Sequence, residues 1–426
     1  MKWRDWTLEL ATPAFLGGAD KSSEWRTASL KTLIRRWWRI VHAREIGYCF
    51  HKLREDEGRL LGHSWLEDSV PGAKKTHVWS FRSPIVVRLE PLDGSWRGTL
   101  LRHQWRKVEN EKLKVDHPWV TPKKTMERSS QGGARISPLL YLGYGPVGAG
   151  TITVPSALQP GSKARILLVQ RSAANDHFWN DELPSVFEGI ALFGTIGSRS
   201  RNGWGSLILV PDTLPNLDQL RERLFTFANK FSRPLDECLQ EEWPHAIARV
   251  DSGMGVWILE KPQKTWQEAM AEIARLKIAI YTQLDGCGSF PKLEENTDWK
   301  HYPEGARLTS RHIMSYPVTN HGVAGWVRER DGKPERSKDR SLRQTGRLPN
   351  QLVFKVHKVR SGNGVSYVAV AVHLAHKIPG ELINKLKEQP RKSLSSSELL
   401  ELWSEVHGFI DDFGERRGTP LWRRVR

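Results

Sequence analysis

Apolar and polar residues alternate from Trp6 to Thr12, a pattern typical of a half-buried strand. Between residues 28 and 44 the apolar residues recur at spacings of three and four, which predicts an amphipathic helix. The patterns that follow predict strands over 85–89 and 164–169, a helix over 184–193 and a strand over 206–210. The order β-α-β-β-α-β is that of a ferredoxin-like domain.

The second half of the chain partly repeats this pattern. Its predicted elements are a strand over 256–259, an amphipathic helix over 266–284, a hairpin with strands over 352–359 and 365–374, and a closing helix over 395–413. We therefore expect an α+β protein with two ferredoxin-like β-α-β-β-α-β domains, the first over 1–212 and the second over 213–426.

Two long stretches have no apolar period of their own. Residues 92–163 are rich in Lys, Arg, Gly and Pro, and we interpret them as an insertion, because a plain loop of that length is improbable in a compact domain. Residues 326–347 combine charged residues with Gly, Ser and Pro, which predicts a mobile basic loop within the second domain.

The net charge of the chain limits the classes of partner that we expect. In 426 residues, 65 Lys and Arg stand against 48 Asp and Glu, and the net charge of +17 predicts a polyanionic partner, either nucleic acid or an anionic membrane surface. No apolar run approaches the ~20 residues that span a bilayer, so we expect no membrane partner. Three widely separated cysteines and a start without an apolar signal region predict reduced thiols and a cytoplasmic location.

The helix over 28–44 carries a row of cations. Lys31, Arg35 and Arg39 recur every four residues, Arg36 lies beside them, and no acid interrupts the row. Such a row matches regularly spaced backbone phosphates, with Thr27 or Ser29 expected to cap the helix. A solvated charged face on a core helix is the structural alternative. A membrane-surface helix is disfavoured because two tryptophans occupy mid-helix.

A second basic segment is the glycine-rich loop over 194–206, which contains Arg199 and Arg201. Its glycines allow close backbone approach to a ligand, and its guanidinium groups suit phosphate. The loop lacks the Gly-Lys-Ser/Thr of a Walker A motif, and it follows a helix where a dinucleotide-binding fingerprint follows a strand. A flexible turn before an edge strand is the alternative.

Catalytic and metal-binding motifs are absent from the sequence. His373 and His376 lie three apart in a predicted strand and so face opposite sides. We find no His-Glu-x-x-His, paired Cys-x-x-Cys or nucleophile elbow, and we expect no catalytic residue, metal or cofactor. A metal-free ribonuclease that uses a histidine such as His42 or His321 stays open as the enzymatic alternative.

Several segments resemble a known family. Three segments resemble the amino end of RAMP proteins of CRISPR systems. They are Leu10-Ala-Thr-Pro-Ala-Phe-Leu-Gly-Gly-Ala-Asp20, Glu24-Trp-Arg-Thr-Ala-Ser-Leu-Lys31 and Leu33-Ile-Arg-Arg-Trp-Trp-Arg39. More narrowly, they are similar to the first-numbered subunit of the type III-B effector, the Cmr complex. Gly197-Ser-Arg-Ser-Arg-Asn-Gly-Trp-Gly-Ser206 is similar to the family's glycine-rich loop, from which Asn202 departs, since a basic residue is more usual there. Tyr141-Leu-Gly-Tyr-Gly145 and Arg347-Leu-Pro-Asn-Gln-Leu-Val-Phe-Lys355 add weaker matches.

The resemblance implies two ferredoxin-like, RRM-related folds and a subunit that binds RNA without a nuclease site of its own. It implies contact with the 3′ region of crRNA, help in capturing target RNA, and other RAMP subunits as partners. The expected RNA-binding residues are Gly17, Gly18, Arg26, Ser29, Lys31, Arg35, Arg36, Arg39, Gly197, Arg199, Arg201 and Gly203.

We therefore expect a non-catalytic RNA-binding subunit in which the basic helix and the glycine-rich loop flank one groove. Trp and Arg side chains would stack on bases, although at least one of Trp37 and Trp38 should be buried. Reversing the charges of Arg35 and Arg39 should weaken RNA binding. The alternatives are an endoribonuclease that processes CRISPR precursor RNA, and a scaffold that binds mainly its protein neighbours.

Overall fold

The structure is a computed structural model of the whole chain. It describes residues 2–17, 22–68, 77–92, 113–118, 120, 122, 126–129, 133–147, 156–171, 176–211, 213–283, 310–315, 326, 329–330, 333–334, 347–362, 364–385, 395–413 and 422–426. Gly18, His321 and most of the basic loop over 326–347 lie outside these residues.

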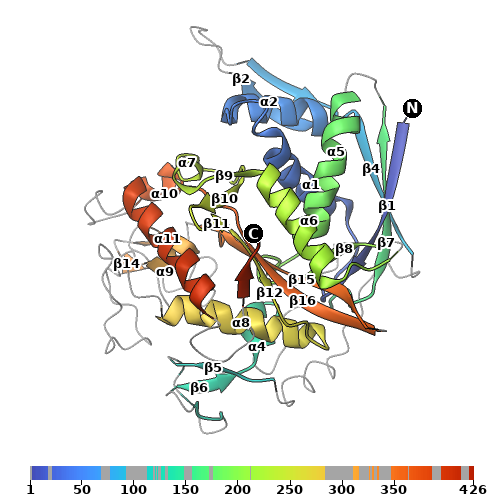
Figure 1. Cartoon of the computed structure of the whole chain (residues 1–426). Helices are drawn as coiled ribbons and strands as arrows, with labels where there is room; N and C mark the ends of the chain where they lie inside the picture. Colours follow the sequence, from blue (N-terminus) through green and yellow to red (C-terminus); the bar gives the residue numbers. More distant parts are fainter. Residues whose placement is uncertain are drawn as a thin grey trace. The chain divides into compact units, whose positions relative to one another are not determined.

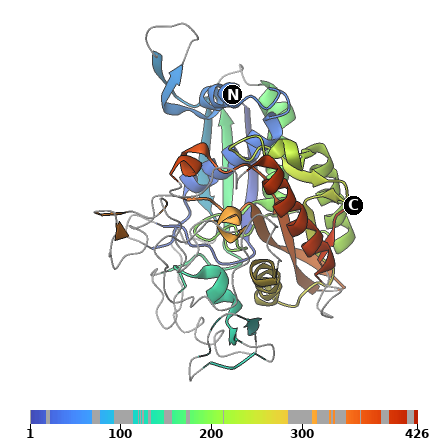
Figure 2. The same ribbon diagram turned by 90° about the vertical axis from the view of Figure 1, so that its left-hand side faces the viewer.

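The first sheet contains four antiparallel strands in the order β4-β7-β1-β8 (Figure 1). They are β1 (Lys2–Leu10), β4 (Ile85–Pro91), β7 (Lys163–Gln170) and β8 (Leu207–Leu209). The central pair β1 and β7 is in register with Trp6 opposite Ile166. Figure 2 shows these strands, blue through green, side by side. The four predicted strands are present in the predicted order along the chain, although β1 begins four residues earlier than the alternation indicated.

Helices α1 (Thr27–His42) and α5 (Leu183–Phe193) form the crossovers of this sheet. Trp37 of α1 stacks on Phe193 of α5 with ring centroids 5.4 Å apart. Gly189 permits this contact, because a Cβ there would lie 2.6 Å from the Trp37 ring. Trp37 and Trp38 are each 1 % exposed, so the prediction that at least one is buried is confirmed. Neither indole is available to stack on a base.

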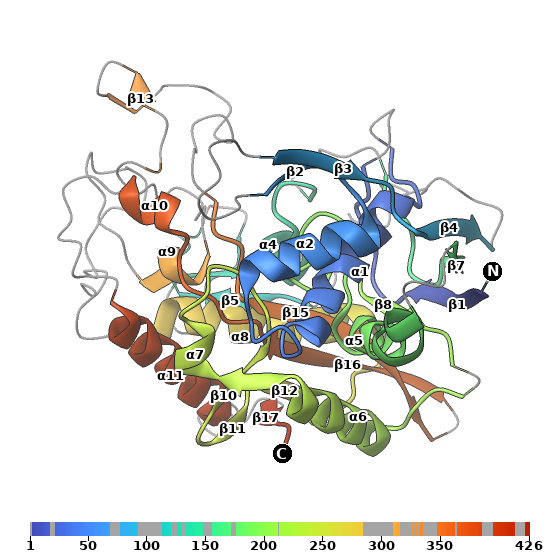
Figure 3. The same ribbon diagram turned by 90° about the horizontal axis from the view of Figure 1, so that it is seen from above.

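Several elements of this region had no clear sequence signal. They are α2 (Phe50–Leu61), β2 (His63–Asp68), β3 (His77–Phe81), the π-helical turn η2 (Phe178–Glu182), α6 (Leu217–Lys230) and, within 92–163, β5 (Val115–His117), β6 (Ala134–Ile136) and α4 (Pro138–Gly143). Helix α2 lies beside α1, as Figure 3 shows. It matters most for the functional site, because it faces the charged side of α1.

A second four-stranded sheet has the order β15-β16-β12-β17. Its strands are β12 (Val256–Leu259), β15 (Leu352–Ser361), β16 (Gly364–His373) and β17 (Trp422–Arg424). The predicted amphipathic helices are α8 (Trp266–Gln283) and α11 (Ser396–Asp412), and a reciprocal capping box between Ser395 and Glu398 begins α11.

The smaller elements complete the fold. They are β9 (Ser232–Pro234), α7 (Leu235–Cys238), β10 (Ile247–Val250), β11 (Gly253–Met254), α9 (Ser310–Met314), β13 (Glu329–Arg330), β14 (Lys333–Pro334) and α10 (Gly380–Asn384). The architecture is mixed α+β with mainly antiparallel sheets, as the sequence predicted. No described helix is both long and apolar enough to cross a bilayer.

The chain divides into two compact units. Unit 1 contains Met1–Phe231, Ile258–Ala274 and Phe354–Val370, and unit 2 contains Ser232–Trp257, Arg275–Val353 and Ala371–Arg426. Both units are therefore built from discontinuous segments. The division into units does not test the continuous domains predicted over 1–212 and 213–426, which remain predictions. All residues of the candidate site belong to unit 1.

Candidate nucleic-acid interface

The first turn of α1 is held by an arginine. The N-cap residue is Arg26, in an extended conformation, and no side chain caps the helix, so the expectation that Thr27 or Ser29 caps it is wrong. Arg26 instead donates to the Gly17 carbonyl at 2.6 Å. This bond ties the helix start to the loop before it, and Ser29 lies half-buried in the first turn.

Arg35 and Arg39 have a shared acidic partner on α2. Arg35 donates to Glu57 Oε1 at 2.6 Å and to the Leu61 carbonyl at 2.8 Å. Arg39 donates to both Glu57 oxygens, with Nη2 3.0 Å from Oε1. Glu57 is 4 % exposed, and a buried carboxylate needs such partners. These two arginines therefore join α1 to α2, and their contact with RNA stays a prediction.

Lys31 and Arg36 lie on the same helix without an acidic partner. Among the described residues, no carboxylate comes within ion-pair distance of either one. Burial, and then the neighbouring Arg39, lowers the pKa of Arg36. Burial, and then Arg35, lowers the pKa of Lys31. Each group thus lies near another positive charge, Lys31 near Arg35 and Arg36 near Arg39, and an incoming anion would stabilise both.

The glycine-rich loop over 194–206 is tied closely to the segment after β1. Thr12 Oγ1 donates to the Gly203 carbonyl at 2.7 Å and accepts from the Ser206 amide at 3.0 Å. The Gly205 amide donates to the Pro13 carbonyl, and the Ser198 amide donates to the Phe15 carbonyl. The loop is therefore a fixed part of unit 1, unlike the flexible turn that the sequence left open.

Its glycines permit left-handed backbone and close packing. Gly197 has φ +89°, and a Cβ there would lie 2.6 Å from the Phe15 carbonyl oxygen. Gly203 has φ +88°, and a Cβ there would lie 2.7 Å from Met270 Sδ. Asn202, where the family pattern favours a basic residue, is buried and donates to the Leu142 carbonyl at 2.9 Å. Packing thus explains these three residues.

The two loop arginines differ from these glycines. Arg199 is exposed, with φ +59°, and its guanidinium lies beside Gly145. Arg201 is half-buried next to Arg36 of α1, and burial together with Arg36 lowers the pKa of Arg201 to about 9. The structure therefore brings the basic helix and the loop together at this pair. We call the four cations Lys31, Arg36, Arg199 and Arg201 on these two elements the cationic cluster, in which Arg36 and Arg201 are the pair in electrostatic contact.

His42 does not have the surroundings of a free acid–base group. Its Nδ1 lies 2.6 Å from Glu182 Oε1, and its Nε2 lies 3.2 Å from Asp56 Oδ2. Burial opposes protonation of His42, but the two carboxylates outweigh it and raise its pKa. Both ring nitrogens of His42 thus contact carboxylates.

Sequence reasoning missed the acidic side of this region. Glu57 is placed by the amphipathic pattern of α2, whose apolar residues Leu53 and Leu60 are buried around it. That pattern was the available signal. His177 and Glu182 have no local signal, because they reach the end of α1 only through the tertiary fold.

Comparisons with known proteins were made at the level of sequence and of structure. No family model matches the chain, and no curated protein matches it. Solved structures are similar to it, and three of them follow. The apo form of Cmr1 from Pyrococcus furiosus gives a TM-score of 0.43 at 15 % identity, covering 95 % of this chain and 97 % of that one.

The other two structures are also CRISPR proteins. A chain of the type III-B Cmr-beta complex bound to cognate target RNA gives a TM-score of 0.42 at 13 % identity, covering 94 % of this chain and 99 % of that one. A chain of a type IV-B CRISPR complex gives 0.27 at 15 % identity, covering 51 % of this chain and 95 % of that one. All three TM-scores lie below 0.5, so the residues of the site carry the proposal that follows.

Proposed function

We propose that this protein is a non-catalytic RNA-binding subunit of a type III-B CRISPR effector ribonucleoprotein. The observation that carries the proposal is the cationic cluster, which combines side chains of α1 and of the glycine-rich loop. The resemblance of these same two segments to RAMP proteins supports the proposal that the protein is a subunit of such a ribonucleoprotein. The proposed ligands are the 3′ region of crRNA and the target RNA, and the proposed neighbours are other RAMP subunits.

The electrostatics of the cluster favour a phosphate. Arg36 lowers the pKa of Arg201, so each charge raises the free energy of the other in the absence of an anion. A phosphodiester between the two guanidinium groups would replace this repulsion with charge-assisted hydrogen bonds. Because phosphates carry no sequence information, recognition of this kind positions RNA independently of its sequence.

The strand orders support an RRM-related fold on both sheets. In β1-α1-β4-β7-α5-β8, the spatial order β4-β7-β1-β8 places the first strand between the third and fourth. In β12-α8-β15-β16-α11-β17, the spatial order β15-β16-β12-β17 repeats this arrangement. We propose that both are ferredoxin-like β-α-β-β-α-β folds, as the resemblance implies.

The proposal predicts binding without cleavage. Of the two histidines considered for a ribonuclease, His42 has both ring nitrogens on carboxylates. RNA cleavage in such an effector would then belong to other subunits. The cytoplasm, where CRISPR transcripts are made, is the proposed location.

The deciding experiment measures binding of labelled crRNA to the whole protein at several salt concentrations. The Arg36→Gln/Arg201→Gln variant should bind about 30-fold more weakly, because two charge-assisted phosphate contacts are lost. The slope of the logarithm of the binding constant against the logarithm of the salt concentration should become shallower by about 1.4, because each phosphate contact on a single strand contributes ~0.7. The control Arg54→Gln/Arg59→Gln removes two exposed charges of α2 and should change affinity less than about twofold.

Three outcomes separate the alternatives. RNA that is shifted but intact, with the loss confined to Arg36→Gln/Arg201→Gln, supports the proposal. Cleavage of repeat RNA by the purified protein would establish the processing endoribonuclease instead. Equal losses in both variants would mean that net charge alone drives binding, and no measurable affinity for free RNA would favour a scaffold.

A further inference from the structure

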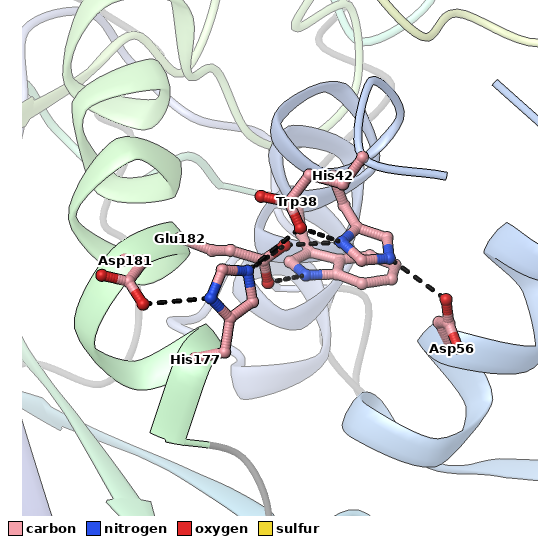
Figure 4. A network of polar contacts seen from close by, with 7 residues as sticks. Trp38, His42, Asp56, His177, Asp181 and Glu182 are labelled. Carbon is pink, nitrogen blue, oxygen red and sulfur yellow. Dashed lines mark hydrogen bonds and ion pairs between the residues drawn. The ribbon is translucent and has the colours of Figure 1, made fainter. Parts of the chain in front are cut away.

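A second cluster of polar side chains lies at the carboxyl end of α1, and Figure 4 shows it from close by. His42 ends the helix and Glu45 follows it, while His177 and Glu182 come from the segment that leads into α5. His177 and Glu45 are exposed, whereas Glu182 is 3 % exposed. Two imidazoles and two carboxylates thus converge from two parts of unit 1 that are distant in sequence.

The spacing of their donor atoms is that of a metal site. His42 Nδ1 lies 2.6 Å from Glu182 Oε1 and 3.6 Å from Glu45 Oε2. His177 Nε2 lies 3.0 Å from Glu45 Oε2 and 4.0 Å from Glu182 Oε1. Bonds of about 2.0–2.1 Å in a tetrahedral zinc site place neighbouring ligand atoms about 3.3 Å apart. The ligand atoms of His42, Glu45 and Glu182 all lie within 4.8 Å of one another. His177 is close to the two carboxylates, and its ring would turn toward His42 to complete the set around an ion.

The atoms that face away from the centre are held by a second layer of contacts. Asp56 Oδ2 lies 3.2 Å from His42 Nε2, and Asp181 Oδ2 lies 3.0 Å from His177 Nδ1. Trp38 Nε1 donates to Glu182 Oε2 at 2.7 Å, which leaves Oε1 toward the centre. A carboxylate behind each imidazole orients the ring and fixes which nitrogen is free to bind a metal.

The charge of the cluster also favours a cation. The four carboxylates are Glu45, Asp56, Asp181 and Glu182, and among the described residues none of them has a Lys or Arg ion-pair partner. This is unusual in a protein with a net charge of +17, where positive side chains are plentiful. Four negative charges thus gather where only two imidazoles oppose them.

We propose that His42, Glu45, His177 and Glu182 bind one Zn²⁺ ion in a closed four-coordinate site. Two imidazole nitrogens and two carboxylate oxygens suit a borderline divalent ion, while Mg²⁺ and Ca²⁺ require six or more oxygen ligands. Because its ligands come from the end of α1 and the start of α5, the ion would lock these two helices together. This inference is independent of RNA binding by the cationic cluster.

The test measures zinc binding to the tag-free, full-length protein after treatment with a chelator. Zn²⁺ is titrated in competition with a chromophoric chelator, and thermal unfolding is followed with and without Zn²⁺. The wild type should bind one ion per chain and unfold at a higher temperature when it is bound. His177→Ala/Glu45→Gln changes two exposed residues, so the variant should fold, but its zinc affinity should fall by at least about 100-fold.

Two further variants sharpen the result. Asp181→Asn, which touches no proposed donor atom except through His177, should weaken binding by about 10-fold. The control His51→Ala/Glu55→Gln removes an exposed histidine and a half-buried carboxylate, which pairs with Arg59, from α2 and should leave zinc affinity and the zinc-dependent stabilisation unchanged. The absence of stoichiometric binding, or equal affinity in the wild type and His177→Ala/Glu45→Gln, would overturn the proposal.

Discussion

Two pairs of cations on one helix have opposite surroundings. Arg35 and Arg39 share the buried carboxylate of Glu57 on α2. Lys31 and Arg36 are interleaved with them in sequence, and no described carboxylate is within ion-pair distance of either. In the sequence all four belong to one uninterrupted basic run. The difference shows that such a run can contain both charges that pair with another helix and charges without a carboxylate partner in the described part of the chain, and that only the partner elements separate them.

The comparison changes the expected effect of substitutions. From the sequence, Arg35 and Arg39 were the arginines whose reversal should weaken RNA binding. In the structure their guanidinium groups are occupied by Glu57 and by the end of α2. We now expect their loss to act first on stability, and the loss of Arg36 and Arg201 to act first on RNA.

The largest effect is expected for Arg35→Gln/Arg39→Gln. This variant leaves the Glu57 carboxylate buried and uncompensated, so the free energy of unfolding should fall by about 3 kcal/mol. Urea denaturation followed by far-ultraviolet circular dichroism measures the change. Adding Glu57→Gln to this variant should restore most of the loss, because a neutral amide needs no counter-charge.

The matched variant Arg36→Gln/Arg201→Gln should lose much less stability than Arg35→Gln/Arg39→Gln, since it leaves the Glu57 carboxylate paired and removes repulsion between Arg36 and Arg201. The comparison would break if Arg35→Gln/Arg39→Gln kept full stability and lost as much RNA affinity as the matched variant. All four arginines would then contact RNA, and the ion pairs with Glu57 would be incidental.

Unit 2 contains two buried imidazoles beside an arginine, and they differ from the arginines of α1 because they can lose their charge. The pH dependence of stability tests this difference. His373 Nδ1 lies 2.9 Å from His407 Nε2, and Arg424 lies beside His407. Burial, and then His376 and Arg424, lowers the pKa of His373 to about 3, and burial likewise lowers the pKa of His407. These imidazoles thus stay neutral beside Arg424, whose own charge is balanced by Asp411 at 2.7 Å.

Acid should therefore destabilise the protein. Folding lowers the pKa values of His373 and His407. Their contribution to the free energy of unfolding is therefore fully present above the unfolded pKa of about 6.5 and is lost as the pH falls toward about 3. Each histidine contributes up to about 1.4 kcal/mol per pH unit in that range. Urea midpoints at pH 7, 6 and 5 should fall steadily, in the wild type and in Arg36→Gln/Arg201→Gln alike. A flat profile would mean that these histidines accept protons in the folded state.

The smallest effect is expected for Lys31→Gln. Lys31 stands one turn before Arg35 and has no acidic partner among the residues described, but its single charge contacts at most one phosphate. We expect RNA affinity to fall about threefold. The slope of the logarithm of the binding constant against the logarithm of the salt concentration should become shallower by about 0.7. Lys52→Gln, at an exposed position of α2, is the control. Equal losses for the two lysines would remove Lys31 from the cationic cluster.

The sequence by itself determined the elements with long, regular patterns. The helix α1, the helix α11 with its capping box, and the hairpin of β15 and β16 were all predictable, because apolar periodicity and turn residues act locally. The two segments that supply the cationic cluster, the basic helix and the glycine-rich loop, were also identified in advance. Short elements such as β9 and β17 were not, because three residues carry too little pattern.

The tertiary structure decided which charges are free and which are buried. Lys355, one of several basic residues near the hairpin, is 1 % exposed and donates to the Ile190 carbonyl at 3.0 Å and to the Ala191 carbonyl. His357 contacts the Leu192 carbonyl at 2.8 Å, so β15 caps the carboxyl end of α5. No local pattern predicts this, since the partners are more than 160 residues apart. A residue type and its spacing fix what a side chain can bind, but only the fold fixes whether its partner is already supplied by the chain.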